Sequence, residues 1–205
     1  QKYPQLFVYS TQILQRVFGD SFKILLQGGV NGRSGFLLDE IKNYAKKFVF
    51  TKDFATALEK LSQKHVVVIT GEAGIGKTML SSMLSFEYVK EGFSFCAIND
   101  IKEAELILSS SEASDKIIFY YNDFLGESFA RFMDGSEGSQ IMLFINRVKK
   151  LKNVRLILNS RTTILNKAIH NFHSFTNGRI TSNEHLLTIE NLSRVDKALM
   201  LYKHM

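Results

Sequence analysis

Residues 71–78 spell Gly-Glu-Ala-Gly-Ile-Gly-Lys-Thr, a glycine-rich segment between two stretches of contrasting character. Directly before it, His65–Thr70 is a short apolar run rich in valine, which predicts a strand buried on both faces. Directly after it, Met79–Lys90 has the composition of a helix. A strand, a glycine-rich turn and a helix in this order are typical of the phosphate-binding loop G-x-x-x-x-G-K-T, whereas an ordinary turn needs neither neighbour. The segment therefore predicts an α/β domain built on a parallel sheet.

Each position of this loop has an expected chemical role. The glycines let the backbone curl so that successive N–H groups point at a phosphate, and the following helix directs its positive dipole end at the same anion. Lys77 would reach the β- and γ-phosphates, and the Thr78 hydroxyl would be a ligand of Mg²⁺. The predicted nucleotide contacts in this segment are Gly71, Glu72, Ala73, Gly74, Ile75, Gly76, Lys77, Thr78 and Met79.

The composition agrees with a folded domain. A chain of 205 residues that is 45% hydrophobic, with 17 phenylalanines, can build one substantial core. No stretch of about 18 apolar residues occurs, so we expect no membrane span and a soluble, cytoplasmic protein. The single Cys96 lies in an apolar segment, which predicts a buried strand thiol rather than a nucleophile or a metal ligand.

The net charge of +6 does not select a partner. The densest basic stretch lies at the predicted carboxyl end of a helix. Basic residues are favourable there because the helix dipole is negative at that end, so the stretch is typical of a solvated helix end. A nucleic-acid surface is the alternative, and we do not expect nucleic acid as a partner. This stretch comprises Arg147, Lys149, Lys150, Lys152 and Arg155.

Residues 1–46 differ in pattern from the remainder and are a predicted appendage, or the tail of an upstream domain. Thr11–Phe18 could form a short helix and Phe22–Leu26 a short strand. Gln27–Gly35 is rich in glycine, which predicts a mobile loop or linker. Leu37–Phe48 then has the spacing of an amphipathic helix.

From residue 47 to residue 205, helices and strands alternate, which predicts a three-layer α/β sandwich with a central five-stranded parallel sheet. A flexible surface loop is predicted at Asp134–Ser139. The predicted strands are His65–Thr70, Phe93–Ile98, Lys116–Tyr121, Val154–Asn159 and His185–Ile189. The predicted helices, besides Met79–Lys90, are Asp53–Leu61, Gln140–Lys150 and Arg194–Lys203.

A phosphate-binding loop of this kind needs an acidic residue at the end of a neighbouring strand to hold Mg²⁺ and orient a water molecule. The apolar run Ile117–Tyr121 is followed by Asn122 and Asp123. Asn122 would take the metal side and Asp123 the position of the catalytic base. Because an amide adds no charge to offset Mg²⁺, we expect slow hydrolysis or weak metal binding. Alternatively, Asp123 takes the metal role, or both residues only cap the next helix.

The fourth predicted strand runs into Ser160 and Arg161. An arginine at the carboxyl end of a central strand can point at the γ-phosphate and report whether it is present. Arg161 is therefore the candidate phosphate sensor, and a surface ion pair is the alternative. The predicted catalytic residues are thus Lys77, Asp123 and Arg161, and the predicted metal ligands are Thr78, Asn122 and Asp123.

In chain order, Gly71–Thr78, Tyr121–Gly126 and Leu156–Arg161 resemble the first, second and sensor motifs of the STAND class of signal-transducing P-loop NTPases, which are AAA+-like. The bacterial group called novel STAND type three is the most similar branch, because its second motif commonly ends Asp-Asp-Phe-Leu-Gly. Asn122 stands here in place of the first Asp.

Two further segments carry the resemblance, which covers residues 47–205 and says little about residues 1–46. Phe48–Thr51 resembles the segment on the adenine side, so Phe48 and Val49 are implied nucleotide contacts. Leu192–Tyr202 resembles the start of the helix after the fifth strand.

The resemblance implies a molecular switch that uses ATP, ADP and Mg²⁺. ATP bound between this domain and a following helical and winged-helix region would hold one assembly state, and hydrolysis would reset it. That following region is not in this sequence, so we expect a fragment. The implied partners are further domains of the same polypeptide and copies of itself. Related proteins often join a sensor to an effector, and many bacterial ones act in antiviral defence.

Other functions stay open at this point. A nucleotide-binding interaction module that scarcely hydrolyses ATP is favoured by Asn122. A DNA-acting ATPase would need a basic or aromatic groove, and a small-molecule kinase would need a substrate lid. ATP is favoured over GTP because no Asn-Lys-x-Asp segment occurs.

Overall fold

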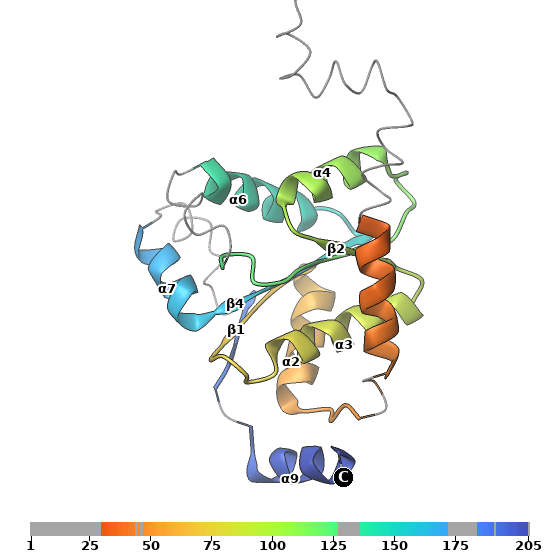
Figure 1. The fold of residues 1–205 in the computed structure, drawn as a ribbon. Coiled ribbons are helices and arrows are strands. Elements are labelled where there is room, and N and C mark those ends of the chain that lie inside the picture. Colours follow the sequence, from red (N-terminus) through yellow and green to blue (C-terminus); the bar gives the residue numbers. More distant parts are fainter. Residues whose placement is uncertain are drawn as a thin grey trace, which may run out of the picture.

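The computed structural model describes residues 30–43, 45, 47–126, 136–171, 184–190 and 192–204. The predicted elements at Thr11–Phe18 and Phe22–Leu26 lie outside these ranges. Within them, helices and strands alternate from α2 to α9, as Figure 1 shows.

Five parallel strands form the sheet, in the order β2-β3-β4-β1-β5. This confirms the predicted three-layer α/β fold with its central five-stranded parallel sheet. All six residues of β1 are buried, because this valine-rich strand has neighbours on both edges and helices on both faces. The strands are β1 (Val66–Gly71), β2 (Ser94–Ile98), β3 (Ile117–Tyr121), β4 (Val154–Arg161) and β5 (Leu186–Ile189).

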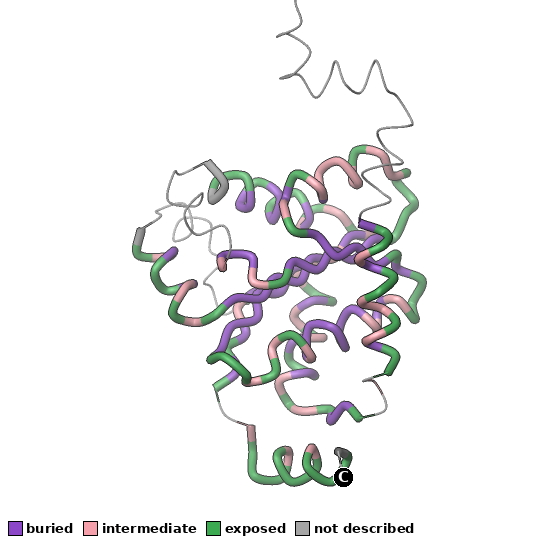
Figure 2. The backbone as a smooth tube through the Cα atoms, viewed as in Figure 1, coloured by how far each residue is buried: buried purple, intermediate pink, exposed green. Residues whose placement is uncertain are grey.

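Helices cover both faces of the sheet (Figure 1). Alternate residues of β1 divide between two cores: Val66 and Val68 pack towards α4, α6 and α7, whereas Val67 and Ile69 pack towards α2 and α3. The helices are α2 (Lys52–Lys64), α3 (Lys77–Lys90), α4 (Ile101–Ser110), α6 (Ser136–Val148), α7 (Thr162–Asn171) and α9 (Arg194–His204). Figure 2 shows the buried sheet between these layers and the mostly exposed α9.

Residues 30–43 are helical, so the loop predicted at Gln27–Gly35 is wrong from residue 30 onward. The glycine content suggested a loop, but contacts with the edge of the sheet hold this segment in a helix. The Ser34 hydroxyl accepts a hydrogen bond of 2.9 Å from the backbone N–H of Ala97 in β2. Val30 is buried in the core as well. The predicted end of this helix at Phe48 is also wrong, because residues 48–50 have no helical structure.

Two helices, α4 and α7, were not predicted. Asp100 caps α4 by accepting a hydrogen bond of 2.9 Å from the backbone N–H of Lys102. The predicted loop Asp134–Ser139 is wrong from residue 136, where α6 begins. None of the helices in the described ranges is long and apolar enough to cross a membrane. Cys96 is buried in β2, as predicted, and burial raises the pKa of its thiol to about 11.

Candidate nucleotide site

The glycine-rich loop joins β1 to α3, as predicted. Gly74 and Gly76 have φ angles of 78° and 100°, a conformation that side chains disfavour. Gly71 is needed for a different reason, because a Cβ there would lie 2.8 Å from the carbonyl oxygen of Ile189. The glycines thus allow both the curled backbone and the close approach of β5 that brings Ile189 to the loop.

Lys77 is the first residue of α3, and its Nζ donates a hydrogen bond of 2.7 Å to the carbonyl oxygen of Glu72. Burial lowers the pKa of Lys77, the positive charge of Arg161 lowers it further, and Asp123 and Glu72 oppose the shift. The structure therefore brings together the three predicted catalytic side chains, Lys77, Asp123 and Arg161. Because the two cations repel each other, an anion placed between them would be stabilised.

Arg161 is the last residue of β4 and pairs in register with Gly71, the first residue of the loop. Its side chain is exposed, as expected of a group that could contact a ligand. Next to this pair, the hydroxyl groups of Thr70 and Thr162 are 3.1 Å apart and join the end of β1 to the start of α7.

Asn122 and Asp123 follow β3 in a turn, and a buried tyrosine organises this region. The Tyr120 hydroxyl donates a hydrogen bond of 3.0 Å to Oδ1 of Asn122 and accepts one of 3.1 Å from Nδ2 of Asn159. The Thr78 side chain also lies close enough to influence this phenol. Burial raises the pKa of Tyr120 to about 12, and the hydrogen bond from Asn159 and the nearby Thr78 side chain oppose that shift. One phenol therefore connects α3, β4 and the turn after β3.

Sequence reasoning gave no role to Tyr120 and Asn159. Asn159 is 2% exposed, and its Oδ1 accepts a hydrogen bond of 2.7 Å from the backbone N–H of Asp123. An asparagine at the end of an apolar strand was the available signal, since a buried amide must find hydrogen-bond partners. Its partners lie on β3 and in the turn after it, and the sequence does not reveal this proximity.

Asp123 has a φ of 46°, a left-handed conformation that Asp tolerates better than most residues. Its Oδ1 is buried and has no hydrogen-bond partner among the residues that the structure describes. Gly126 leaves room for this carboxylate, because a Cβ at position 126 would lie 2.1 Å from Oδ2. An orphaned carboxylate oxygen beside the phosphate-binding loop suits a bound cation or an ordered water molecule.

The available donors fit Mg²⁺, which prefers oxygen ligands and usually binds with the phosphates of a substrate. Thr78 offers a hydroxyl, Asn122 an amide oxygen and Asp123 a carboxylate. In the described part of the chain, no group of three or more His, Cys, Asp or Glu side chains could hold a metal ion.

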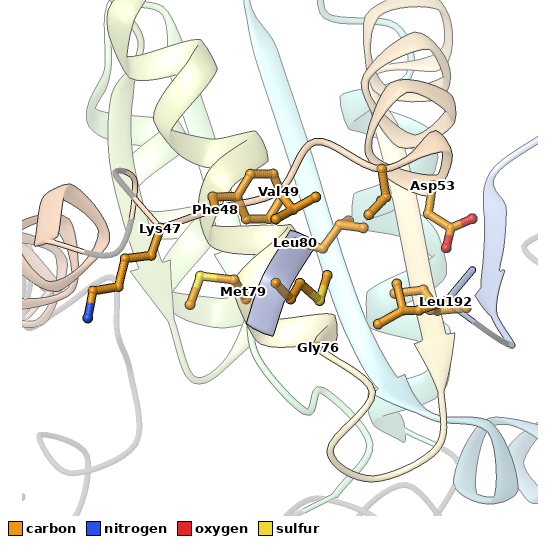
Figure 3. A pocket seen from close by; sticks show the side chains of 11 residues that line it. Lys47, Phe48, Val49, Asp53, Gly76, Met79, Leu80 and Leu192 are labelled. Atoms are coloured by element: carbon orange, nitrogen blue, oxygen red, sulfur yellow. The ribbon is translucent and has the colours of Figure 1, made fainter. Parts of the chain in front are cut away.

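A cavity of about 150 Å³ lies beside the end of the loop and the start of α3, where Gly76, Met79 and Leu80 line it (Figure 3). Phe48, Val49 and Met79, three of the predicted nucleotide contacts, line it. The ring centroids of Phe48 and Phe54 are 5.3 Å apart, and this contact helps to position Phe48. The other lining residues are Lys47, Thr51, Asp53, Ile189, Leu192 and Met200.

Helix α9 completes this cavity through Met200, and Nζ of Lys203 donates a hydrogen bond of 2.6 Å to the carbonyl oxygen of Phe48. Burial raises the pKa of Asp53 at the rim, and the charge of Asp196 in α9 raises it further. The sequence did not reveal that α9 lines this cavity, because α9 and the segment around Phe48 are far apart in the chain and only the fold brings them together.

The protein-family model described as Novel STAND NTPase 3 matches residues 48–205. No curated protein matches this chain.

Solved structures similar to this chain include AMPPCP-bound DnaA from Aquifex aeolicus, with 16% identity and a TM-score of 0.49, over 77% of this chain and 52% of DnaA. Another is the ORC2 protein from Aeropyrum pernix in its ADPNP–ADP complexes, with 12% identity and a TM-score of 0.46, over 74% of this chain and 49% of ORC2. A third is PCH-2 from C. elegans, with 16% identity and a TM-score of 0.40, over 70% of this chain and 43% of PCH-2. This chain thus spans about half the length of the first two.

Proposed function

This chain belongs to the Novel STAND NTPase 3 family, and we propose that it is the ATP-binding, ATP-hydrolysing switch domain of a larger signalling or defence protein. The observation that carries the proposal is the convergence of Lys77, Asp123 and Arg161 around the glycine-rich loop. A phosphate chain in the loop would neutralise the repulsion between the two cations, which favours binding of a polyphosphate.

Each proposed role follows from the position of the side chain. Lys77 would bind the β- and γ-phosphates, and Arg161, at the end of β4, would sense the γ-phosphate. Mg²⁺, when bound by Thr78 and by Asn122 or Asp123, supplies positive charge to the phosphates. The orphaned Oδ1 of Asp123 would accept a hydrogen bond from the attacking water and orient it.

The apolar cavity would hold the base of the nucleotide. Its walls are mostly side-chain carbon and sulfur atoms, and planar adenine can be sandwiched between Phe48 or Val49 and Met79. Because α9 lines this cavity and bonds to the backbone of Phe48, base binding would hold α9 in place. We propose ATP and ADP as the nucleotides.

The proposal extends to the rest of the protein. Residues 47–205 would form the switch domain, and residues 1–46 would belong to an appendage or an upstream domain. The family match, which begins at residue 48, supports this boundary. Further domains of the same polypeptide and copies of the protein would be its partners, in the cytoplasm.

Calorimetry with ATP and ADP, in EDTA and in Mg²⁺, tests nucleotide binding, and phosphate release measured in parallel tests hydrolysis. We expect Lys77→Ala to lose nucleotide binding, because it removes a cation from the loop. Lys90→Ala removes the same side chain from the other end of α3 and should bind normally. Equal affinities for Lys77→Ala and Lys90→Ala would refute the proposed site.

The second candidate function is a nucleotide-binding module with little or no hydrolysis. Asn122 favours it, because its exposed amide accepts a hydrogen bond from Tyr120 but brings no negative charge to the metal side. Asn122→Asp should raise phosphate release if the remaining site is competent. Asn99→Asp, at the end of the adjacent strand β2, is the matched control for added charge. Tight binding without release in the wild type and in Asn122→Asp would favour the module.

A further inference from the structure

A second cavity, of about 420 Å³, lies beside the phosphate-binding loop. Leu37, Glu40 and Ile41 of helix 30–43 form one wall of it. The other wall is the loop and the start of α3, namely Gly74, Gly76, Lys77, Thr78, Met79 and Ser82. Helix 30–43 precedes residues 48–205, which the family model matches.

Contacts at both ends fix helix 30–43 against the domain. At its start, Ser34 bonds to β2, and Arg33 forms an ion pair of 2.7 Å with Glu103 of α4. Near its end, Ile41 is 3% exposed and packs in the core that contains α2 and α3. In Figure 1 this helix, coloured orange, stands beside β2 and α3. Its rotation about its own axis is therefore set, and Glu40 is held at the cavity.

Glu40 is half-buried and makes no hydrogen bond or ion pair with any residue in the described ranges. Its neighbour Asp39 is 3.1 Å from Nζ of Lys42 and has its charge balanced on the same helix. A half-buried carboxylate loses hydration, so a cation that enters the cavity would be attracted to it. Thr78, whose hydroxyl is the proposed Mg²⁺ ligand from the loop, lines the same cavity.

We propose that Glu40 supplies the phosphate end of the site with the negative charge that Asn122 lacks, and thereby makes nucleotide binding depend on Mg²⁺. This inference rests on the proposed nucleotide-binding function. In the absence of Mg²⁺, the carboxylate repels the phosphate chain and weakens binding. In its presence, the carboxylate attracts the cation and strengthens binding. Glu40 therefore lowers the nucleotide affinity measured without Mg²⁺ and raises the affinity measured with Mg²⁺.

The test is the ratio of the ADP dissociation constant in EDTA to that in Mg²⁺, measured by calorimetry on the whole chain. For Glu40→Gln we expect tighter binding in EDTA, weaker binding in Mg²⁺ and a ratio reduced about fivefold, as for charges several ångströms apart near a protein surface. Glu40→Asp, which retains the charge, should lower the ratio less than Glu40→Gln does. Asp39→Asn removes the same charge from a side chain that is 76% exposed on the same helix, and should leave the ratio unchanged.

Three results would overturn the inference. The first is an equal change of both dissociation constants in Glu40→Gln, which indicates a merely structural role. The second is an unchanged ratio, and the third is a ratio that falls as much in Asp39→Asn, which indicates a general effect of charge. If the wild-type chain binds ADP but shows one of these results, the proposed function stands and only the role of Glu40 fails. If the wild type does not bind ADP, both fail.

Discussion

The carboxylate of Asp123 occupies the space that a side chain at position 126 would need. A Cβ built on Gly126 lies 2.1 Å from Oδ2 and 2.5 Å from Cγ of Asp123. Since non-bonded atoms prefer separations of about 3.5 Å, Gly126→Ala would have to displace the carboxylate by more than about 1 Å. The carboxylate would then leave the place where we propose that it orients water.

Two opposing contributions decide how much Gly126→Ala changes the free energy of unfolding. Moving Asp123 off its preferred rotamer costs about 0.5–1.5 kcal/mol, whereas replacing glycine by alanine stabilises the fold by about 0.4–1 kcal/mol through the unfolded chain. In wild type, Gly126→Ala should therefore change the free energy of unfolding little. In an Asp123→Ala background the clash is absent, so the same substitution should stabilise. We expect a coupling energy of about 1 kcal/mol between the two positions.

Urea denaturation of the four proteins of this double-mutant cycle measures the coupling. Phosphate release by Gly126→Ala should fall to the level of Asp123→Ala if the carboxylate acts on water. An equal effect of Gly126→Ala in both backgrounds would refute the reasoning, because it would show that the carboxylate does not fill this space.

Three further predictions concern other buried polar groups. Tyr120→Phe leaves Nδ2 of Asn159 without its acceptor and should lower the free energy of unfolding by about 1–3 kcal/mol in urea; a loss below about 0.5 kcal/mol would contradict the network. Burial raises the pKa of Cys96 from 9.0 to about 11, so the unfolded chain ionises first as pH rises, and stability present below pH 9 is lost towards pH 11. In Cys96→Ala the loss of unfolding free energy between pH 9 and pH 11 should be smaller by up to about 2–3 kcal/mol. Identical pH dependence of stability in the wild type and in Cys96→Ala would refute the raised pKa. Ser34→Ala removes the acceptor of the Ala97 N–H and should cost about 1 kcal/mol of unfolding free energy, with increased amide exchange at Ala97 as the local readout.

The parallel sheet and the phosphate-binding loop could be predicted because their signals are local. A valine-rich run, a glycine-rich turn and a helix lie next to one another in the sequence, and each restricts the backbone by itself. The turn after β3 that contains Asp123 and the arginine at the end of β4 were predicted in the same way, since the carboxyl ends of parallel strands meet at one edge. Their catalytic roles remain predictions.

The first part of helix 30–43, before the predicted start at Leu37, could not be predicted because its cause is tertiary. A Cβ at Gly32 or Gly35 would meet no atom within 4 Å, so neither glycine is there for lack of space. Their presence lowers the intrinsic helix propensity, and the sequence pattern therefore favoured a loop. The contacts of Val30 and Ser34 with the edge of the sheet outweigh that preference. Such contacts join residues more than sixty positions apart, which periodicity cannot report.

The Tyr120 network gives the proposed site a physical link between its parts. A metal ion that draws the Thr78 hydroxyl towards itself would change the interaction of this hydroxyl with the Tyr120 phenol. Asn159 would carry that change to Asp123, because its side chain bonds to both the phenol and the Asp123 N–H.

The same network makes Asn122→Asp an informative substitution. The phenol can donate its hydrogen to a carboxylate as readily as to an amide oxygen, so the bond at 3.0 Å would be retained while negative charge is added. A change in phosphate release would then report the charge at position 122 rather than a rearranged turn. An unchanged free energy of unfolding in that variant is the control that this argument requires.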